Sequence, residues 1–334
     1  PHREAVATTM AGRAFADQRA VTAERAGGTR IWVPIVEGSD RTGVLAITVD
    51  DPSEALVRSC EELGLLTGYL IATHARSTDV FNQRRRRRDL SLAASMQWDL
   101  LPPLALKAER LDVACVLEPA YQVGGDCFDY ALNDLTFDIA VIDAMGHGVT
   151  SALIAALTVG IYRHDRRLGR SLEHTHADLE SAMAQHFPAA FATGQLARVD
   201  LGTGTMTWIN AGHPLPMLIR AGVVIGELAC PASLPWGLGA LAQGPTSAVV
   251  ATEALEPGDS VLFYTDGVVE AHTSAGEPFG VERLADLAGQ HASDHLEPEE
   301  IVRRLVRTVL DHQDDRLADD ATLVLVKWKG PKPP

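Results

Sequence analysis

The pattern of apolar and polar positions divides the chain into three stretches of different character. From Arg110 onward, short apolar runs alternate with longer amphipathic ones, and glycine-, proline- or aspartate-rich turns separate them. The short runs predict strands over 111–117, 137–142, 191–201, 205–209, 217–219, 223–227, 260–264 and 323–328. The amphipathic runs predict helices over 150–162, 177–187, 281–291 and 298–313. This stretch therefore mixes short strands with long helices, and several of its turns carry aspartate.

The first stretch, residues 1–81, shows a strand pair followed by a helix. Branched apolar residues cluster over 30–36 and 43–49 with turn residues between them, which predicts a hairpin. A helix is then expected, with Ser53 as its N-cap, because apolar positions recur at helical spacing over 56–71.

The middle stretch, residues 76–101, is expected to be a connecting helix. It contains the arginine run 84–88, followed by apolar residues at roughly helical spacing, and Pro102-Pro103 ends it. The basic run is compatible with a solvated helix face. The alternative is a linker helix that pairs with its twin in a homodimer and relays a signal downstream.

Composition limits the class of protein. The chain has 334 residues, 46% of them hydrophobic, which suits two packed domains or one large domain with an attached piece. A net charge of −15 disfavours nucleic-acid binding. Four scattered cysteines argue against a zinc site or a disulfide framework and for a reducing compartment. With neither a membrane-spanning apolar run nor a signal peptide, we expect a cytoplasmic protein without a membrane partner, and the initial proline suggests an excerpt of a longer chain.

Aspartates at the ends of predicted strands are the candidate chemistry. Asp143 ends the strand 137–142 and precedes a glycine turn, Asp266 follows the strand 260–264, and Asp126 follows two glycines. The last members are Asp319 or Asp320, before the final strand. Such scattered carboxylates suit Mg²⁺ or Mn²⁺, and two such ions can activate a water and hold a phosphoryl group. Taken alone, the turn after Asp143 also fits an ordinary strand–turn–helix corner.

Other reactive side chains have simpler interpretations. The sequence contains no GxSxG or GxxxxGK[ST] motif, which disfavours a serine hydrolase and a P-loop enzyme. Cys127 has no basic neighbour to activate it. His147 is a candidate proton donor but fits a packed turn histidine better, and His213 and Glu270 are expected to be structural.

Five ordered motifs resemble the SpoIIE-like branch of the metal-dependent protein phosphatases (PPM), relatives of protein phosphatase 2C. They are GGDCFDY, DAMGHG, NAGHPLP, TDGVVEA and DDATLVLV, and the resemblance covers residues 108–329. It implies an α+β fold, a four-layer αββα sandwich of two antiparallel sheets with flanking helices, and a site for two Mn²⁺ or Mg²⁺ ions. The stretch SLAASMQWDLLPP in the linker 82–107 is similar to the segment that precedes such domains. The pattern WVPI…G…GVLAIT resembles part of a GAF sensory domain, so residues 1–81 are expected to be a partial, smaller α/β domain of that kind.

The resemblance also implies roles for individual residues. Asp143 would bridge the two metals, the Ala144 carbonyl would bind one of them, and Asp266 and Asp319 would complete the second metal's ligands. Asp126 would ligate a metal or position its water, whereas Asp320 and Asp129 would support the ligands, with the choice between Asp319 and Asp320 as direct ligand left open. Ala144 replaces a frequent glycine, and the basic residue that grips phosphate in protein phosphatase 2C has no evident counterpart.

The implied activity is hydrolysis of phosphoserine or phosphothreonine in proteins. In this branch the usual substrate is a phosphorylated anti-sigma-factor antagonist of STAS fold, in bacterial partner-switching signalling. Two alternatives remain open, a catalytically silent signalling module of the same fold and a phosphohydrolase of small molecules.

Overall fold

The structure is a computed structural model that describes residues 9–25, 27–37, 40–75, 91–118, 124–231, 233–241, 248–313 and 319–331. The chain divides into two compact units, Pro1–Asp89 and Leu90–Pro334, and each is described by itself. Most of the predicted connecting helix lies outside the described residues. Its described part is α4 (Leu92–Leu100), which starts at the cap Ser91 and ends before Pro102.

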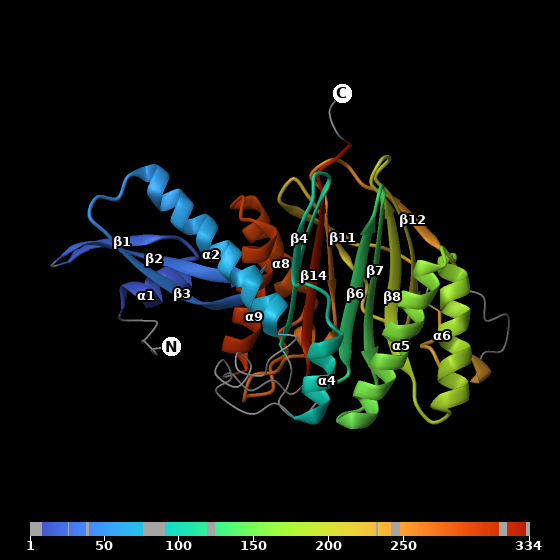
Figure 1. Cartoon of the computed structure of the whole chain (residues 1–334). Coiled ribbons are helices and arrows are strands. Elements are labelled where there is room, and N and C mark those ends of the chain that lie inside the picture. The colour runs from blue at the N-terminus through green and yellow to red at the C-terminus, as the bar shows by residue number, and fades with distance from the viewer. Residues whose placement is uncertain are drawn as a thin grey trace. The chain divides into compact units, whose positions relative to one another are not determined.

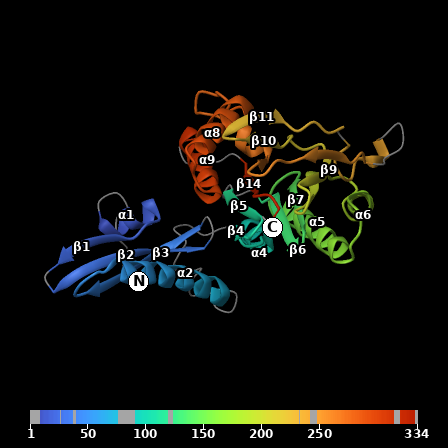
Figure 2. The ribbon, with the colours of Figure 1, turned by 90° about the horizontal axis from the view of Figure 1, so that it is seen from above.

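The smaller unit contains a three-stranded antiparallel sheet. Its strands are β1 (Val21–Arg25), β2 (Gly28–Glu37) and β3 (Asp40–Val49), and its helices are α1 (Met10–Asp17) and α2 (Glu54–Ala75). The predicted hairpin is confirmed, with Ile35 opposite Gly43, and Ser53 caps α2 by accepting a hydrogen bond from the Leu56 amide at 3.2 Å. Figures 1 and 2 show α1 and α2 on opposite sides of this sheet.

The larger unit contains two antiparallel sheets. The six-stranded sheet has the order β11-β10-β13-β14-β5-β4, and the five-stranded sheet has the order β12-β9-β8-β7-β6. The strands are β4 (Ala105–Lys107), β5 (Leu111–Glu118), β6 (Asp126–Asn133), β7 (Thr136–Ala144), β8 (Ala192–Asp200), β9 (Thr205–Ala211), β10 (Met217–Arg220), β11 (Val223–Glu227), β12 (Ala251–Ala254), β13 (Ser260–Tyr264) and β14 (Ala321–Trp328). The helices are α5 (Val149–Arg167), α6 (Leu172–His186), α7 (Asp266–Val269), α8 (Val281–Ser293) and α9 (Pro298–His312), with the short 3₁₀ helix η1 (Gly239–Leu241).

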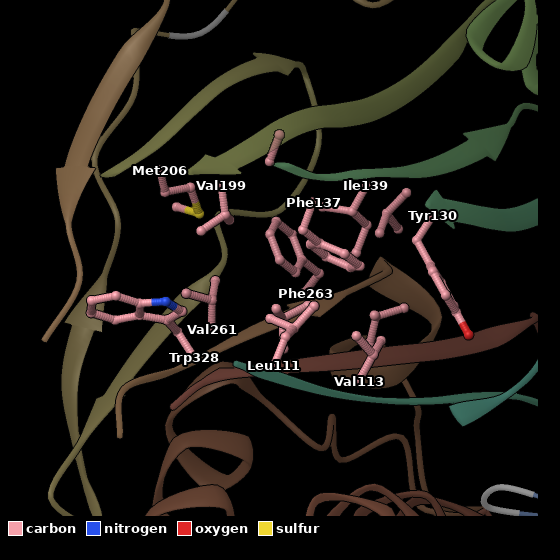
Figure 3. Close-up of a cluster of buried hydrophobic side chains, with 14 of the residues drawn as sticks. Leu111, Val113, Tyr130, Phe137, Ile139, Val199, Met206, Val261, Phe263 and Trp328 are labelled. Carbon is pink, nitrogen blue, oxygen red and sulfur yellow. The ribbon is translucent and has the colours of Figure 1, made fainter. Parts of the chain in front are cut away.

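The two sheets pack face to face on a shared apolar core. Alternate residues of their strands point inward because side chains in a strand alternate between its two faces. Figure 3 shows Phe137 and Ile139 of one sheet opposite Leu111 and Phe263 of the other, all 0–1% exposed. This core holds together the two strand sets that carry the predicted aspartates.

Helices cover the outer faces of both sheets. Helices α8 and α9 pack on the six-stranded sheet through residues such as Leu284 and Leu305, and α5 and α6 pack on the five-stranded sheet through residues such as Ile154 and Leu179. Figure 1 shows the resulting order of layers: α8 and α9, the sheet with β14, the sheet with β7, then α5 and α6. The predicted αββα sandwich is therefore confirmed for this unit. Among the described residues, no helix is long and apolar enough to cross a membrane.

Candidate active site

Asp126 and Asp143 lie opposite each other at one end of the five-stranded sheet. Asp126 opens β6, and its partner across the β6–β7 ladder is Asp143, near the end of β7. Asp143 is also paired with Thr193 on β8. Two carboxylates in directly opposed positions repel each other unless a cation or a proton compensates them.

The six-stranded sheet brings further carboxylates to the same edge. Strand β13 ends at Tyr264, so that Asp266 begins the short helix α7, and Asp319 and Asp320 immediately precede β14. Gly267 allows these two segments to meet, because a Cβ at this position would collide with the Asp320 carbonyl oxygen and lie 3.4 Å from the Asp319 Cβ. All five predicted aspartates of the metal site thus gather where strand ends of both sheets face each other.

Hydrogen bonds tie Asp126 to the opposite sheet. Its Oδ2 atom accepts hydrogen bonds from the hydroxyl groups of Thr265, at 2.7 Å, and Thr322, at 2.6 Å. The Thr265 hydroxyl oxygen in turn accepts from the Thr322 amide at 3.1 Å. Asp126 is 3% exposed, and its contacts fix the separation of the two sheets at the site.

Asp320 is the second buried carboxylate, and it is bonded to the loop that leads into β6. Its Oδ2 accepts hydrogen bonds from the amides of Gly125, at 3.0 Å, and Asp126, at 3.3 Å. The side chain of Gln97 on α4 donates to the same oxygen at 2.7 Å and also to the Asp126 carbonyl at 2.7 Å. Helix α4 is therefore part of the site's framework.

The remaining carboxylates are more accessible. Asp143 and Asp266 are half-buried and Asp319 is exposed, and the Asp319 Oδ1 accepts from the Asp320 amide at 2.8 Å. Asp319, rather than the deeply bonded Asp320, is thus the better placed of the two to meet a ligand. The Ala144 carbonyl lies against Gly125, where a Cβ would collide with it, and the Ala144 amide donates to the Gly125 carbonyl at 3.1 Å.

The crowding of carboxylates raises their pKa values. Burial, followed by repulsion from Asp266, Asp319 and Asp320, raises the pKa of Asp143 to about 7. Burial and the charges of Asp143 and Asp320 raise the pKa of Asp126 well above its ordinary value, although the two threonine hydroxyls oppose the shift. Desolvation, with the charges of Asp320 and Asp266, also raises the pKa of Asp319. The site therefore favours binding either protons or cations.

The side chains at this edge offer the oxygen ligands that a hard divalent cation binds, although they do not form a complete coordination site. Within the described part of the chain, no three histidine, cysteine, aspartate or glutamate side chains form a group that could hold a metal ion as they stand. The neighbours are all oxygen donors, which Mg²⁺ and Mn²⁺ prefer, and their raised pKa values show the charge that a cation would offset. The residues therefore fit these ions in the chemistry of their ligand atoms.

Asp129 has a different environment. Its carboxylate oxygens accept from Arg163 and Arg166 of α5, each at 2.7 Å, and it is 2% exposed. Arg163 also donates to the carbonyl of Leu100 at the end of α4. Asp129 thus fastens α5 and α4 to β6.

The other reactive side chains have structural contacts or stand apart. His213 is buried, which lowers its pKa to about 3, and its Nδ1 lies 2.9 Å from the Thr193 hydroxyl. Cys127 is buried beneath α5, and burial raises the pKa of its thiol well above its ordinary value. His147 and Glu270 are exposed. None of these four has an atom in the hydrogen-bond network that joins Asp126 to Asp320.

Three residues of that network were not predicted as site residues: Gln97, Thr265 and Thr322. Gln97 is polar but occupies an inward position of α4 beside the buried Ala93 and Ala94, which is a signal in the sequence that a specific partner exists. Thr265 directly precedes Asp266, and Thr322 lies two residues after Asp320. Their role depends on contacts with residues more than a hundred positions away, which spacing alone does not show.

The chain has the fold of protein phosphatase 2C domains, and carboxylates gather at one edge of its two sheets. The sequence pattern of the Stage II sporulation protein E (SpoIIE) family matches residues 133–329, more than half of the chain, and the chain belongs to that family.

Curated relatives carry a phosphatase name. The chain is 24% identical over 279 residues to phosphoserine phosphatase RsbU of Bacillus subtilis, covering 79% of this chain and 77% of RsbU. It is 24% identical over 255 residues to phosphoserine phosphatase RsbP of the same organism, covering 73% of this chain and 58% of RsbP. The match thus spans less than two thirds of the second relative.

Solved structures share the sandwich fold. The RsbU and RsbW domains of Rv1364c from Mycobacterium tuberculosis match with a TM-score of 0.60 and 25% identity over 69% of this chain and 63% of that one. The SiaA-PP2C domain of Pseudomonas aeruginosa matches with a TM-score of 0.59 and 23% identity over 71% of this chain and 94% of that one. RsbX, solved in complex with magnesium, matches with a TM-score of 0.51 and 17% identity over 67% of this chain and 98% of that one.

Proposed function

We propose that this chain removes phosphate from phosphoserine or phosphothreonine in a protein, and that its carboxylate edge holds two Mn²⁺ or Mg²⁺ ions for this reaction. The observation that carries the proposal is the gathering of Asp143, Asp266 and Asp319 at one edge of the sandwich. There burial, followed by the charges of Asp266, Asp319 and Asp320, raises the pKa of Asp143 to about 7. When bound, such ions supply the Lewis acidity that activates water and stabilises a phosphoryl group during hydrolysis.

The residues divide into two tasks. Asp143, Asp266, Asp319 and the Ala144 carbonyl would hold the ions, because they are accessible or lie beside the glycine that admits close approach. Asp126 and Asp320 would keep these ligands in place, since their Oδ2 atoms are engaged by donors from the opposite sheet, the β6 loop and α4. Orientation by buried hydrogen bonds is how metal ligands are commonly fixed.

An apolar patch next to Asp143 supports a protein substrate over a small molecule. Met145, Val149 and Leu153 follow one another at four-residue spacing, and their side chains are 37%, 44% and 46% exposed. Val149 and Leu153 are one turn apart on the same side of α5, and Met145 lies in the turn that precedes this helix. Exposed apolar groups beside a charged site suit a folded phosphoprotein that binds through its own apolar surface.

The partner would be a phosphorylated STAS-domain protein, in a partner-switching pathway. This substrate class is consistent with likeness to RsbU, RsbP and the structure of RsbU and RsbW domains. Dephosphorylation would then change which partner the STAS protein binds.

The first experiment measures hydrolysis of p-nitrophenyl phosphate and of a phosphoserine STAS-domain protein, with Mn²⁺ and with EDTA. Asp143→Asn and Asp266→Asn are expected to lower both activities at least 100-fold, because each removes a charged oxygen ligand. Asp138→Asn is the matched control, since Asp138 is a buried aspartate of the same strand β7 whose partner is Arg198 at 2.7 Å. Activity that survives EDTA, or that persists in Asp143→Asn, would contradict the mechanism; binding of the STAS protein without any turnover would favour the silent module.

A second comparison separates protein from small-molecule substrates. Val149→Ser with Leu153→Ser is expected to raise KM for the phosphoprotein about tenfold and to leave p-nitrophenyl phosphate turnover unchanged. Leu168→Ser is the control, because Leu168 is 58% exposed at the opposite end of α5. Equal effects of the patch change on both substrates would argue against docking through this patch.

A further inference from the structure

The turn that follows β9 is fastened to the inner face of the five-stranded sheet. Asn210, near the end of β9, lies on the same face as Trp208, whose side chain belongs to the core between the sheets. The Asn210 Oδ1 accepts from the His213 amide at 2.8 Å, and its Nδ2 donates to the His213 carbonyl at 2.9 Å. Both residues are buried. The backbone of His213 is therefore held in one place.

The His213 ring lies close to strands of both sheets. Its Nδ1 is 2.9 Å from the hydroxyl oxygen of Thr193, on β8 of the five-stranded sheet. The backbone of Tyr264, the last residue of β13 in the six-stranded sheet, lies near enough to oppose the fall in the pKa of His213 that burial causes. The Nε2 atom is buried and makes no hydrogen bond to the part of the chain that the structure describes. The hydrogen bond that orients the ring is therefore the one to Thr193.

Thr193 lies directly beside the candidate ligand Asp143. The two residues are partners in the β7–β8 ladder, and both are half-buried. Directly opposed residues of an antiparallel pair project to the same face, with their Cβ atoms about 4.5–5.5 Å apart. A threonine side chain has three staggered rotamers, and the hydrogen bond to His213 selects one of them. His213 thus determines which way the Thr193 hydroxyl points next to the carboxylate.

We propose that His213 is a positioning residue for Asp143 and acts on it through the Thr193 hydroxyl. With Thr193 held in one rotamer, the neighbouring carboxylate has fewer orientations and stays directed at the edge where Asp266 and Asp319 lie. The inference rests on the proposed function, because it concerns the binding of a divalent ion by Asp143. Groups that orient a metal ligand are worth about 10–100-fold in metal affinity.

Two substitutions of His213 separate its hydrogen bond from its packing. The side-chain amide of asparagine stands as many bonds from Cα as Nδ1 does, whereas that of glutamine stands as many bonds away as Nε2. His213→Gln is therefore expected to weaken Mn²⁺ binding by about tenfold or more, and His213→Asn to keep it within about threefold of the wild type. Both variants lose the ring. Electron paramagnetic resonance of free Mn²⁺ in a titration of the full chain measures binding without turnover, and equal losses in the two variants would overturn the proposal.

Substitution of Thr193 tests the other end of the hydrogen bond. Thr193→Val removes the hydroxyl and retains the branched shape, so Mn²⁺ binding should again weaken by about tenfold. Combined with His213→Gln it should weaken little further, because both changes remove the same interaction. Thr207→Val is the control, since Thr207 is a half-buried threonine of the adjacent strand β9 whose hydroxyl donates to the Arg198 carbonyl at 3.5 Å. Additive losses in the double variant would contradict coupling through this bond.

The same titration distinguishes this inference from the proposed function. A wild-type chain that binds no Mn²⁺ would overturn both. A wild-type chain that binds Mn²⁺ and hydrolyses p-nitrophenyl phosphate, with all variants binding equally well, would overturn the role of His213 alone. The expected pattern is a higher Mn²⁺ requirement in His213→Gln and Thr193→Val, with kcat at saturating Mn²⁺ within about threefold of the wild type, because the ligands themselves are intact.

Discussion

Gln97 is the residue at which α4 meets both sheets. Its amide nitrogen donates to the Asp126 carbonyl on β6 and to the Asp320 carboxylate before β14, each at 2.7 Å, and the side chain is fully buried. A single amide thus sets the distance between the strand ends that carry the candidate ligands. It also compensates part of the charge on Asp320, which has little access to water.

Gln97→Leu is expected to leave the Asp320 carboxylate short of a buried donor. The free energy of unfolding should fall by about 1–3 kcal/mol, and Mn²⁺-dependent hydrolysis should fall at least tenfold. Gln195→Leu is the comparison, because Gln195 is also buried and donates to a backbone carbonyl, that of Pro214, at 2.7 Å. Denaturant titration and p-nitrophenyl phosphate turnover measure the two effects. A loss of activity in Gln195→Leu as large as in Gln97→Leu would mean that stability alone explains the result.

At the residue scale, the sequence predicts the aspartates that follow strands and misses their donors. Asp143 and Asp266 were predictable because an apolar run followed by aspartate and glycine is a local pattern. The hydrogen bond from Thr265 to Asp126 joins residues 139 positions apart, and the one from Gln97 to Asp320 joins residues 223 positions apart. Such contacts depend on how the two sheets stack, and the spacing of residues within a short stretch of sequence does not reveal that stacking.

At the scale of elements, the pair β6 and β7 determines how closely the Ala144 carbonyl can approach the site. Gly125 precedes β6 and contacts that carbonyl directly, and its own carbonyl accepts from the Ala144 amide at 3.1 Å. The adjacent Gly124 packs on Ala93 of α4. The glycine pair therefore lets three elements converge where any side chain would separate them.

Gly125→Ala should push the start of β6 away from the end of β7. We expect at least a 30-fold loss of Mn²⁺-dependent activity and a decrease of about 1–3 kcal/mol in the free energy of unfolding. The new methyl group would collide with the backbone carbonyl of Ala144, which cannot move aside as a flexible side chain can. Gly160→Ala is the control: it lies inside α5 with nothing within 4 Å of a new Cβ, and it should raise stability by about 0.5–1 kcal/mol. Turnover and thermal melting of both variants measure these effects. Full activity in Gly125→Ala would show that the close contact between Gly125 and the Ala144 carbonyl is not required.

The predicted elements and the observed ones differ mainly in short strands. The hairpin of β2 and β3 and the long strands β5, β7, β8 and β14 were predictable from apolar runs. Strand β6 was not predicted, because the paired glycines suggested a turn at Asp126, which instead opens the strand. β1, β4 and β12 were not predicted either, because none of their residues is buried and they show no clear apolar run. They are held by pairing with longer strands, a tertiary effect that outweighs their weak local preference.

At the scale of the whole molecule, the ionised carboxylates of the site destabilise the fold that brings them together. In the metal-free protein the pKa of Asp143 is raised to about 7, and those of Asp126 and Asp319 are also raised. A raised carboxyl pKa means that the folded state binds protons more tightly than the unfolded chain does. This contribution to stability is complete below pH 4 and is lost as the pH rises through about 7.

The melting temperature of EDTA-treated protein is therefore expected to fall between pH 5 and pH 8. The fall corresponds to a decrease of about 1–3 kcal/mol in the free energy of unfolding. Mn²⁺ should remove most of this decrease because it replaces the protons, and Asp143→Asn should flatten the metal-free profile. Calorimetry across this range measures both. A metal-free protein that grows more stable from pH 5 to pH 8 would show that the carboxylates are not in mutual repulsion.

Strand β14 is the last of the described strands in sequence, yet it lies between β13 and β5 in the middle of its sheet. During synthesis, β5 leaves the ribosome some two hundred residues before the neighbour with which it pairs. Until β14 is inserted, β5 and β4 are not joined to β13, β10 and β11, and Thr322, Asp319 and Asp320 are absent from the site. A nascent chain can therefore complete neither the six-stranded sheet nor the carboxylate edge before its last described strand is made. The phosphatase unit should become protease-resistant and competent for metal in a single late step, and its folding should be slow because its contacts are distant in sequence.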